Sequence, residues 1–293
     1  MKKLNYLLVA LLAFATVTTA CKKKAADAAE ATTEEAACCG KCETEVPEAN
    51  GVPAYVVINK PQVNLDEFAK DADGFITLFD GTSFKGWRGY GKGEMPSRWV
   101  IEDGAIRFAG SGAGEAQDQT GGDIMFEYKF KNFELSFDWK VAKGSNSGVF
   151  FLAQEVKDQP IYISSPEYQI LDNENHPDAK LGENGNRKSS SLYDMIPAVP
   201  QNSKPFGEWN TGGIMVYKGT VVHKQNGANV VEYHLWTPQW TELLQKSKFS
   251  QEKWPLAFEL LKNLGGEAHE GYIGLQDHGD DVWYKNIRIK ILD

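Results

Sequence analysis

The chain has 293 residues, including 28 Gly, eight Trp and eleven Tyr, and its formal net charge is −9. This acidic balance argues against nucleic acid as a partner and against membrane attachment through a polybasic surface. About 220 residues remain after a polar N-terminal stretch, which is a common size for one all-β domain. The abundance of aromatic residues and glycine is typical of a β-sandwich with many turns.

The N-terminus has the pattern of an exported protein. Lys2 and Lys3 precede the apolar run Leu7–Phe14, which is too short to span a bilayer as a mature helix. Small residues then lead to Cys21, which resembles a bacterial lipobox, although Thr18 stands where Leu is usual. We predict a signal peptide over residues 1–20 and an acyl anchor on Cys21. The alternative is an ordinary secretory signal.

Residues 21–70 are predicted to be an acylated and mostly disordered tether. The part from 22 to 50 is rich in Ala, Glu, Thr and Lys, a composition that buries too little apolar surface to order a chain. It contains Cys38, Cys39 and Cys42, but no nearby His, and the spacing is not a standard zinc pattern. We interpret these thiols as passive. The expected location is the bacterial cell envelope, with the domain lipid-anchored and facing the periplasm or the surface.

Residues 71–293 alternate short apolar segments with Gly, Asn, Asp and Pro, as strands alternate with turns. The clearest strand is Phe133–Val141, in which every second residue is apolar. Thr237 and Pro238 predict a helix start, and Phe258–Leu264 predicts a second helical turn. The sequence therefore predicts an all-β jelly-roll sandwich of two curved antiparallel sheets with a short helical excursion.

Polar residues gather at alternating positions of three predicted strand regions. Glu167 and Gln169 face one way while Tyr168 faces the other, and Gln276 shares a face with His278. Asn146 lies in a glycine-flanked turn that enters a strand. Each residue alone is equally consistent with a solvent-exposed edge or a structural role. Together they indicate the floor of a cleft, and Trp209 adds either an aromatic wall or a core residue.

Eight motifs occur in a fixed order along the chain. They are Leu78–Gly81 with Gly86-Trp87, Trp99 with Asp103-Gly104, Phe133–Leu135, Asn146–Val149, Glu167–Asp172, Gly207–Asn210, Asn226-Gly227, and Gly274–Gly279 with Asn286-Ile287. In this order they resemble one bacterial family, named for a 3-keto-disaccharide hydrolase domain. The resemblance covers about residues 74–292 and departs from the family in the 173–203 loop and the 236–270 excursion. It implies a concanavalin A-like fold and action on carbohydrate, including cleavage of glycosides whose C3 hydroxyl is oxidised to a ketone.

The predicted strand lacks the carboxylate pair of an ordinary glycosidase. Related β-glucanases carry theirs at alternate positions of one strand, where this chain has Glu167 and then Gln169, which cannot ionise. A ketone at C3 acidifies the C2 proton, so that a base can remove it and the C1 substituent leaves by elimination. One base, one proton donor and one group for the enolate oxygen would suffice.

Several roles are open for the named residues. Glu167 or His278 is the candidate base, with the other assisting the leaving group. The candidate substrate ligands are Asn146, Gln169, Gln276, Tyr168 and Trp209. A divalent metal held by Glu167, Asp172 and His278 is an alternative way to polarise the ketone, although Asp172 has the opposite strand parity from Glu167. Elimination and hydrolysis both remain open, as do a non-catalytic, lectin-like envelope lipoprotein and a structural envelope module.

Overall fold

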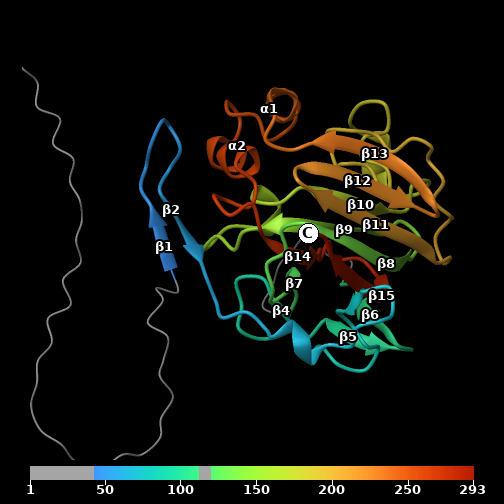
Figure 1. Ribbon diagram of the computed structural model, residues 1–293. Helices are drawn as coiled ribbons and strands as arrows, with labels where there is room; N and C mark the ends of the chain where they lie inside the picture. Colours follow the sequence, from blue (N-terminus) through green and yellow to red (C-terminus); the bar gives the residue numbers. More distant parts are fainter. Residues whose placement is uncertain (1–42, 112–119) are drawn as a thin grey trace, which may run out of the picture. The chain divides into compact units, whose positions relative to one another are not determined.

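The computed structural model describes residues 43–111 and 120–293, and two antiparallel sheets packed face to face dominate this part of the chain (Figure 1). The five-stranded sheet has the order β10 (Glu167–Leu171), β9 (Asn146–Ala153), β14 (Tyr272–Leu275), β7 (Ile124–Phe126) and β4 (Trp87–Gly89). The eight-stranded sheet has the order β13 (Ala228–His234), β12 (Thr220–Gln225), β11 (Asn210–Tyr217), β8 (Phe133–Val141), β15 (Val282–Ile291), β6 (Ala105–Phe108) and β5 (Trp99–Glu102), with β3 (Ile76–Thr77) paired to β15.

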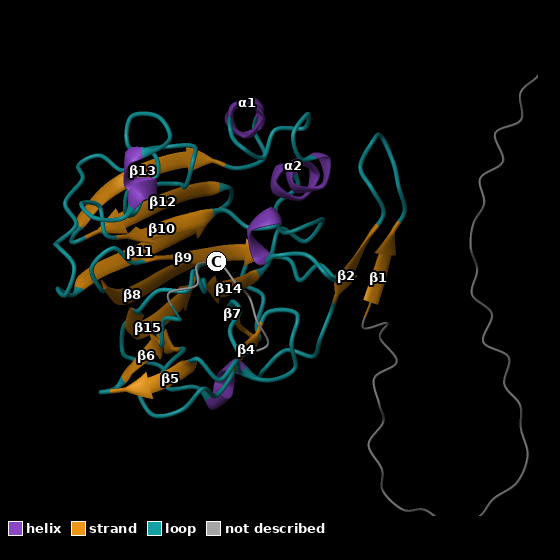
Figure 2. Cartoon of the chain, turned by 180° about the vertical axis from the view of Figure 1, so that it is seen from behind, coloured by secondary structure: helices purple, strands orange, loops and turns teal. Residues whose placement is uncertain are grey.

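The core lies between the sheets. Along β8, buried residues alternate with partly exposed ones, because this strand covers the core with one face and meets solvent with the other. Every residue of β9 and β10 is buried, because loops and a helical segment cover the other face of the five-stranded sheet. The predicted fold of two antiparallel sheets is therefore confirmed (Figure 2).

Two helices form the predicted excursion, and they lie together beyond the end of β13. In α1 (Pro238–Lys246), the Thr237 side chain accepts the Trp240 N–H at 3.2 Å, which confirms the predicted cap. Helix α2 (Pro255–Lys262) begins earlier than predicted, because Pro255 starts it. Neither helix in the described ranges is long and apolar enough to cross a membrane.

Secondary structure within the described residues begins at Glu43, inside the segment that was predicted to be a mostly disordered tether. A hairpin of β1 (Glu43–Val46) and β2 (Tyr55–Ile58) is followed by the short 3-10 helix η1 (Leu65–Glu67). The Ile58 N–H donates to the Glu155 carbonyl at 2.8 Å, and Tyr55 and Phe68 pack on the core. The run Tyr55–Ile58 is apolar enough to form a strand although its surroundings are polar. Cys21, Cys38, Cys39 and Cys42 lie outside the described residues.

His223 is a buried core histidine that makes stability depend on pH. Its ring lies 5.1 to 5.9 Å from the rings of Phe151, Tyr168 and Tyr233, and burial lowers its pKa from 6.5 to about 4. Below pH 6.5 the unfolded chain binds a proton here that the native chain does not, so acidification to pH 4 should cost about 3 kcal/mol of unfolding free energy. Urea denaturation of the wild type and of His223→Gln at pH 6.5 and at pH 4 should show that the variant lacks this loss of unfolding free energy. Equal losses in both proteins would contradict the prediction.

Candidate active site

A small pocket, with a volume of about 20 Å³, lies on the face of the five-stranded sheet that is turned away from the eight-stranded sheet. It gathers all five polar residues that the sequence placed on a cleft floor. Its lining residues are Asn146, Tyr162, Glu167, Gln169, Tyr193, Lys248, Gln276 and His278.

Strand register places the floor residues on one face. Gln169 of β10 pairs with Gly148 of β9, and the Gln276 N–H, just after β14, donates to the Gly148 carbonyl at 2.9 Å. Since paired residues on antiparallel strands share a face, Glu167, Gln169 and Gln276 point to the same side. Tyr168 points the other way, as the alternation requires.

Gly148 makes room for the Glu167 carboxylate. A Cβ built on Gly148 would lie 2.5 Å from Glu167 Oε1 and 2.8 Å from its Cγ. The carboxylate therefore lies against the backbone of β9 at Gly148, where a larger residue than glycine would displace it. Glu167 is itself buried, with 8 % of its surface exposed.

Three buried amide atoms in this pocket have no hydrogen-bond partner among the described residues. They are Asn146 Oδ1, Gln169 Nε2 and Gln276 Oε1. Buried polar side-chain atoms are nearly always hydrogen-bonded, so a cluster of three exceptions needs an explanation. Both donor and acceptor atoms are present, which matches the hydroxyl groups of a sugar, since a hydroxyl donates and accepts.

Two loop segments build the pocket wall. Tyr193 comes from the 173–203 loop and Lys248 follows α1, and the Lys248 Nζ lies 4.6 Å from the Tyr193 ring centre. The Tyr193 hydroxyl donates to Asp178 at 2.9 Å, and the Lys248 N–H donates to Asp194 at 2.9 Å. Burial, together with the Glu167 and Asp178 carboxylates, raises the pKa of the Tyr193 hydroxyl, so it stays protonated.

The ion pairs of Arg187 hold this wall together. Its guanidinium contacts Asp178 at 2.8 Å and Asp194 at 2.7 Å. These are the two carboxylates that bind Tyr193 and Lys248. No sequence pattern predicted Tyr162, Tyr193 or Lys248, because these residues lie in segments whose apolar residues repeat neither every two positions, as in a strand, nor every 3.6, as in a helix. A third segment, the 3-10 helix η2 (Ile161–Ile163), supplies Tyr162.

Three of the predicted site residues lie elsewhere. Tyr168 is fully buried in the core, where its ring meets Phe137 edge-on. Trp209 lies on the outer face of the eight-stranded sheet, with the Lys285 Nζ 4.0 Å above its ring. The Asp172 carboxylate accepts backbone N–H groups of Gly144 at 2.8 Å and Glu174 at 3.1 Å, so it caps a turn. These positions correct the assignment of Tyr168 and Trp209 to the cleft and of Asp172 to a metal site.

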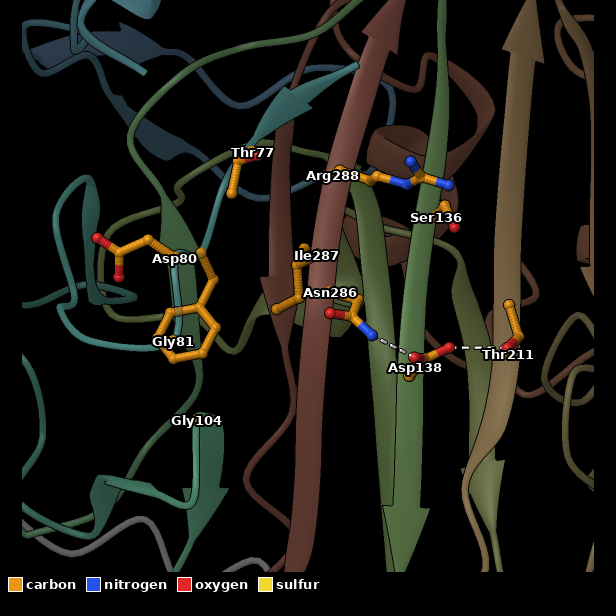
Figure 3. Close-up of a pocket in the computed structure, with 11 residues that line it drawn as sticks. Thr77, Asp80, Gly81, Gly104, Ser136, Asp138, Thr211, Asn286, Ile287 and Arg288 are labelled. Carbon is orange, nitrogen blue, oxygen red and sulfur yellow. Dashed lines mark hydrogen bonds between the residues drawn. The ribbon is translucent and has the colours of Figure 1, made fainter. Parts of the chain in front are cut away.

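A larger hollow, of about 590 Å³, lies on the outer face of the eight-stranded sheet (Figure 3). Its polar groups bind one another: Thr211 Oγ1 and Asn286 Nδ2 donate to the Asp138 carboxylate at 2.7 and 2.6 Å. Arg288, also on this face, pairs with Asp71 at 3.1 Å. Since these groups already have partners, the smaller pocket around Glu167 is the better candidate for chemistry.

Comparison with known proteins agrees with the resemblance carried by the motifs. Residues 74–290 match the family described as the 3-keto-alpha-glucoside-1,2-lyase-like domain. A Bacteroides thetaiotaomicron protein named 3-keto-disaccharide hydrolase is 72% identical over 232 residues, which cover 76% of this chain and 80% of that protein.

Two solved structures share the fold. Both are crystal structures described as a "putative glycosyl hydrolase" from Parabacteroides distasonis. The first is 28% identical with a TM-score of 0.63 and covers 80% of this chain and 100% of its own. The second is 27% identical with a TM-score of 0.53 and covers 74% of this chain and 99% of its own. The family match spans most of the folded domain, and the chain belongs to the family of 3-keto-α-glucoside-1,2-lyase-like domains.

Proposed function

We propose that this protein is a carbohydrate-active enzyme that cleaves the glycosidic bond of 3-keto-glycosides. The observation that carries the proposal is a single buried glutamate, Glu167, beside three amide atoms that have no partner among the described residues and line the same small pocket. Family membership and the name of the Bacteroides thetaiotaomicron relative support the same substrate class. One carboxylate is too few for an ordinary double-displacement glycosidase but enough for elimination next to a ketone.

In the proposed elimination, a base takes the proton from C2 of the sugar and the C2 electron pair forms a double bond to C1. The C1–oxygen bond breaks, and the leaving oxygen takes a proton from an acid. Glu167 is the proposed base and His278 the proposed acid, with the reverse assignment as the alternative. The amides of Asn146, Gln169 and Gln276 are proposed to hold the hydroxyl and enolate oxygens. Water addition at C1 would complete a net hydrolysis.

The test uses the purified full-length chain with a 3-keto-glucoside and with the matching unoxidised glucoside. We expect the aglycone to be released from the 3-keto substrate alone. In D₂O, elimination followed by hydration places deuterium at C2 of the product, whereas direct hydrolysis leaves C2 unlabelled. Binding of both glycosides without turnover of either would overturn the proposal in favour of the lectin-like alternative.

Gly148→Ala is expected to lower kcat by about 100-fold because the new Cβ displaces the Glu167 carboxylate. The atoms that must move are the end of a side chain, so the fold and the melting temperature should be nearly unchanged. Steady-state kinetics measures the expected loss of kcat, and thermal denaturation measures whether the melting temperature stays the same. Gly93→Ala is the control, because a Cβ at Gly93 meets nothing within 4 Å. Full activity in Gly148→Ala would contradict the placement of the carboxylate.

We further propose that the mature protein is anchored to the cell envelope through acylated Cys21, with its domain facing the periplasm or the cell surface. The short apolar run behind Lys2 and Lys3 and the small residues before Cys21 support this. The expressed protein should partition into the detergent phase on phase separation, and Cys21→Ala should move it to the aqueous phase. Identical partitioning of both forms would contradict the anchor.

A further inference from the structure

We propose that His176, His278 and Asp280 bind one divalent transition-metal ion at the edge of the pocket. One potential ligand atom from each residue lies within 4.8 Å of the other two. His176 precedes the 3-10 helix η3 (Pro177–Lys180), while His278 and Asp280 follow β14. The metal ligands predicted from the sequence were Glu167, Asp172 and His278. Only His278 belongs to the present group, in which His176 and Asp280 are the other two candidate ligands.

The spacing of His278 and Asp280 fits two ligands of one ion better than a direct hydrogen bond. His278 Nδ1 and Asp280 Oδ2 are 3.8 Å apart, which is too far for a hydrogen bond. Two ligands that each lie ~2.1 Å from one ion are about 3.0 to 4.2 Å apart. The His176 and His278 rings meet at 82° with centres 5.7 Å apart, so they are not stacked on each other.

The carboxylate and the pocket floor are positioned to support such a site. Asp280 Oδ2 accepts the Asn146 backbone N–H at 3.1 Å, which orients the carboxylate as outer-shell hydrogen bonds do in metal sites. Asn146 and Gln276 line the same pocket as His278 and are only 4 % and 6 % exposed. Their side-chain oxygens have no donor within the described part of the chain. An ion, or water bound to it, would satisfy them.

The donor set indicates the class of ion. Two imidazoles and one carboxylate suit first-row divalent ions such as Mn²⁺, Fe²⁺, Co²⁺ or Zn²⁺ and leave coordination positions open. An ion there would stabilise negative charge that develops on a keto or enolate oxygen in the pocket, a role that rests on the proposed function. With His278 bound to the ion, water on the ion would take the place of His278 as the proton donor to the leaving oxygen. Metal binding itself does not depend on that role.

His176 gives the proposal a local signature. Its Nδ1 accepts the Asp178 N–H at 3.2 Å and thereby caps η3. Ligation through Nε2 requires the ring proton on Nδ1, so the Asp178 N–H would lose its acceptor. When the ion binds, hydrogen exchange of the Asp178 amide should therefore become faster. Most other backbone amides should exchange at the same rate or more slowly.

The test is calorimetric titration of the chelator-treated full-length chain with Mn²⁺, Co²⁺ and Zn²⁺, with bound Co²⁺ also followed by its visible absorption. We expect one ion per chain and a loss of affinity of at least tenfold in both His176→Ala and Asp280→Asn. Asp280→Asn keeps the cap of η3, so it remains informative if His176→Ala disturbs the loop. His269→Ala is the control, since His269 stacks on Trp236 instead. No binding by the wild type, or equal binding by these variants, would overturn the site.

Failure of this inference and failure of the proposed function give different results. If the protein binds one ion through these residues but cleaves no 3-keto-glycoside, the metal site stands and the proposed function is wrong. If it cleaves the substrate at full rate after chelation and binds no ion, the proposed function stands and the metal site is wrong.

Discussion

Glu167→Gln is expected to lower kcat for a 3-keto-glycoside by about 1,000-fold while KM changes little. Removal of a general base typically costs between ~10² and ~10⁴ in rate, and Glu167 is the one carboxylate among the described residues that line the pocket. Gln keeps the size and most of the polar contacts of Glu, so substrate binding should survive. Steady-state kinetics with purified variants, at one pH and with one substrate, measures both constants.

A matched control separates the role of the carboxylate from general effects of the substitution. Glu232→Gln makes the same chemical change at an exposed position on β13 and should leave kcat unchanged. A decrease smaller than about tenfold in Glu167→Gln would remove Glu167 from the role of base and transfer that role to His278. Unchanged turnover in both Glu167→Gln and His278→Gln would exclude this pocket as the site of the chemistry.

Strand alternation explains why sequence could place the pocket floor. The side-chain period of two puts Glu167 and Gln169 on one face without reference to the rest of the fold. The joint appearance of such residues in three strand regions then indicated one cleft floor. The parity argument was also sound for Tyr168, which lies on the core side as its position in the strand requires. Its assignment to the substrate ignored that parity.

The wall and two of the proposed metal ligands, His176 and Asp280, were beyond sequence reasoning for a different reason. Tyr193, Lys248 and His176 lie in irregular segments, whose course is set by contacts that form only in the folded state. Arg187, for example, fixes the wall through two carboxylates in its own loop, and nothing in their spacing indicates that pairing. Similarly, the four-residue strand Tyr55–Ile58 could not be predicted from composition, because a composition averaged over the polar segment around it hides so short an apolar run.

Arg88→Met is expected to cost about 3 to 5 kcal/mol of unfolding free energy, the usual result of removing one partner from a buried ion pair. Arg88 is 3 % exposed and makes two bonds to Glu155, at 2.8 and 2.6 Å, and one to Glu127 at 2.8 Å. Glu155 is fully buried, so the substitution leaves a carboxylate with little solvent and without its main partner. Urea denaturation at pH 7 measures the loss.

The double variant Arg88→Met with Glu155→Leu distinguishes an unpaired charge from lost packing. If the uncompensated carboxylate dominates, the double variant should be more stable than Arg88→Met, because apolar replacements of a whole buried pair are often tolerated. Arg107→Met, at a more exposed ion pair with Glu102 and Asp281, should have a much smaller effect. A double variant no more stable than the single one would mean that the backbone contacts of this cluster, such as the Gly91 N–H bond to Glu155, matter more than its charges. Because Arg88 lies on the same sheet as Glu167, activity of the remaining native protein would show whether this cluster also positions the pocket.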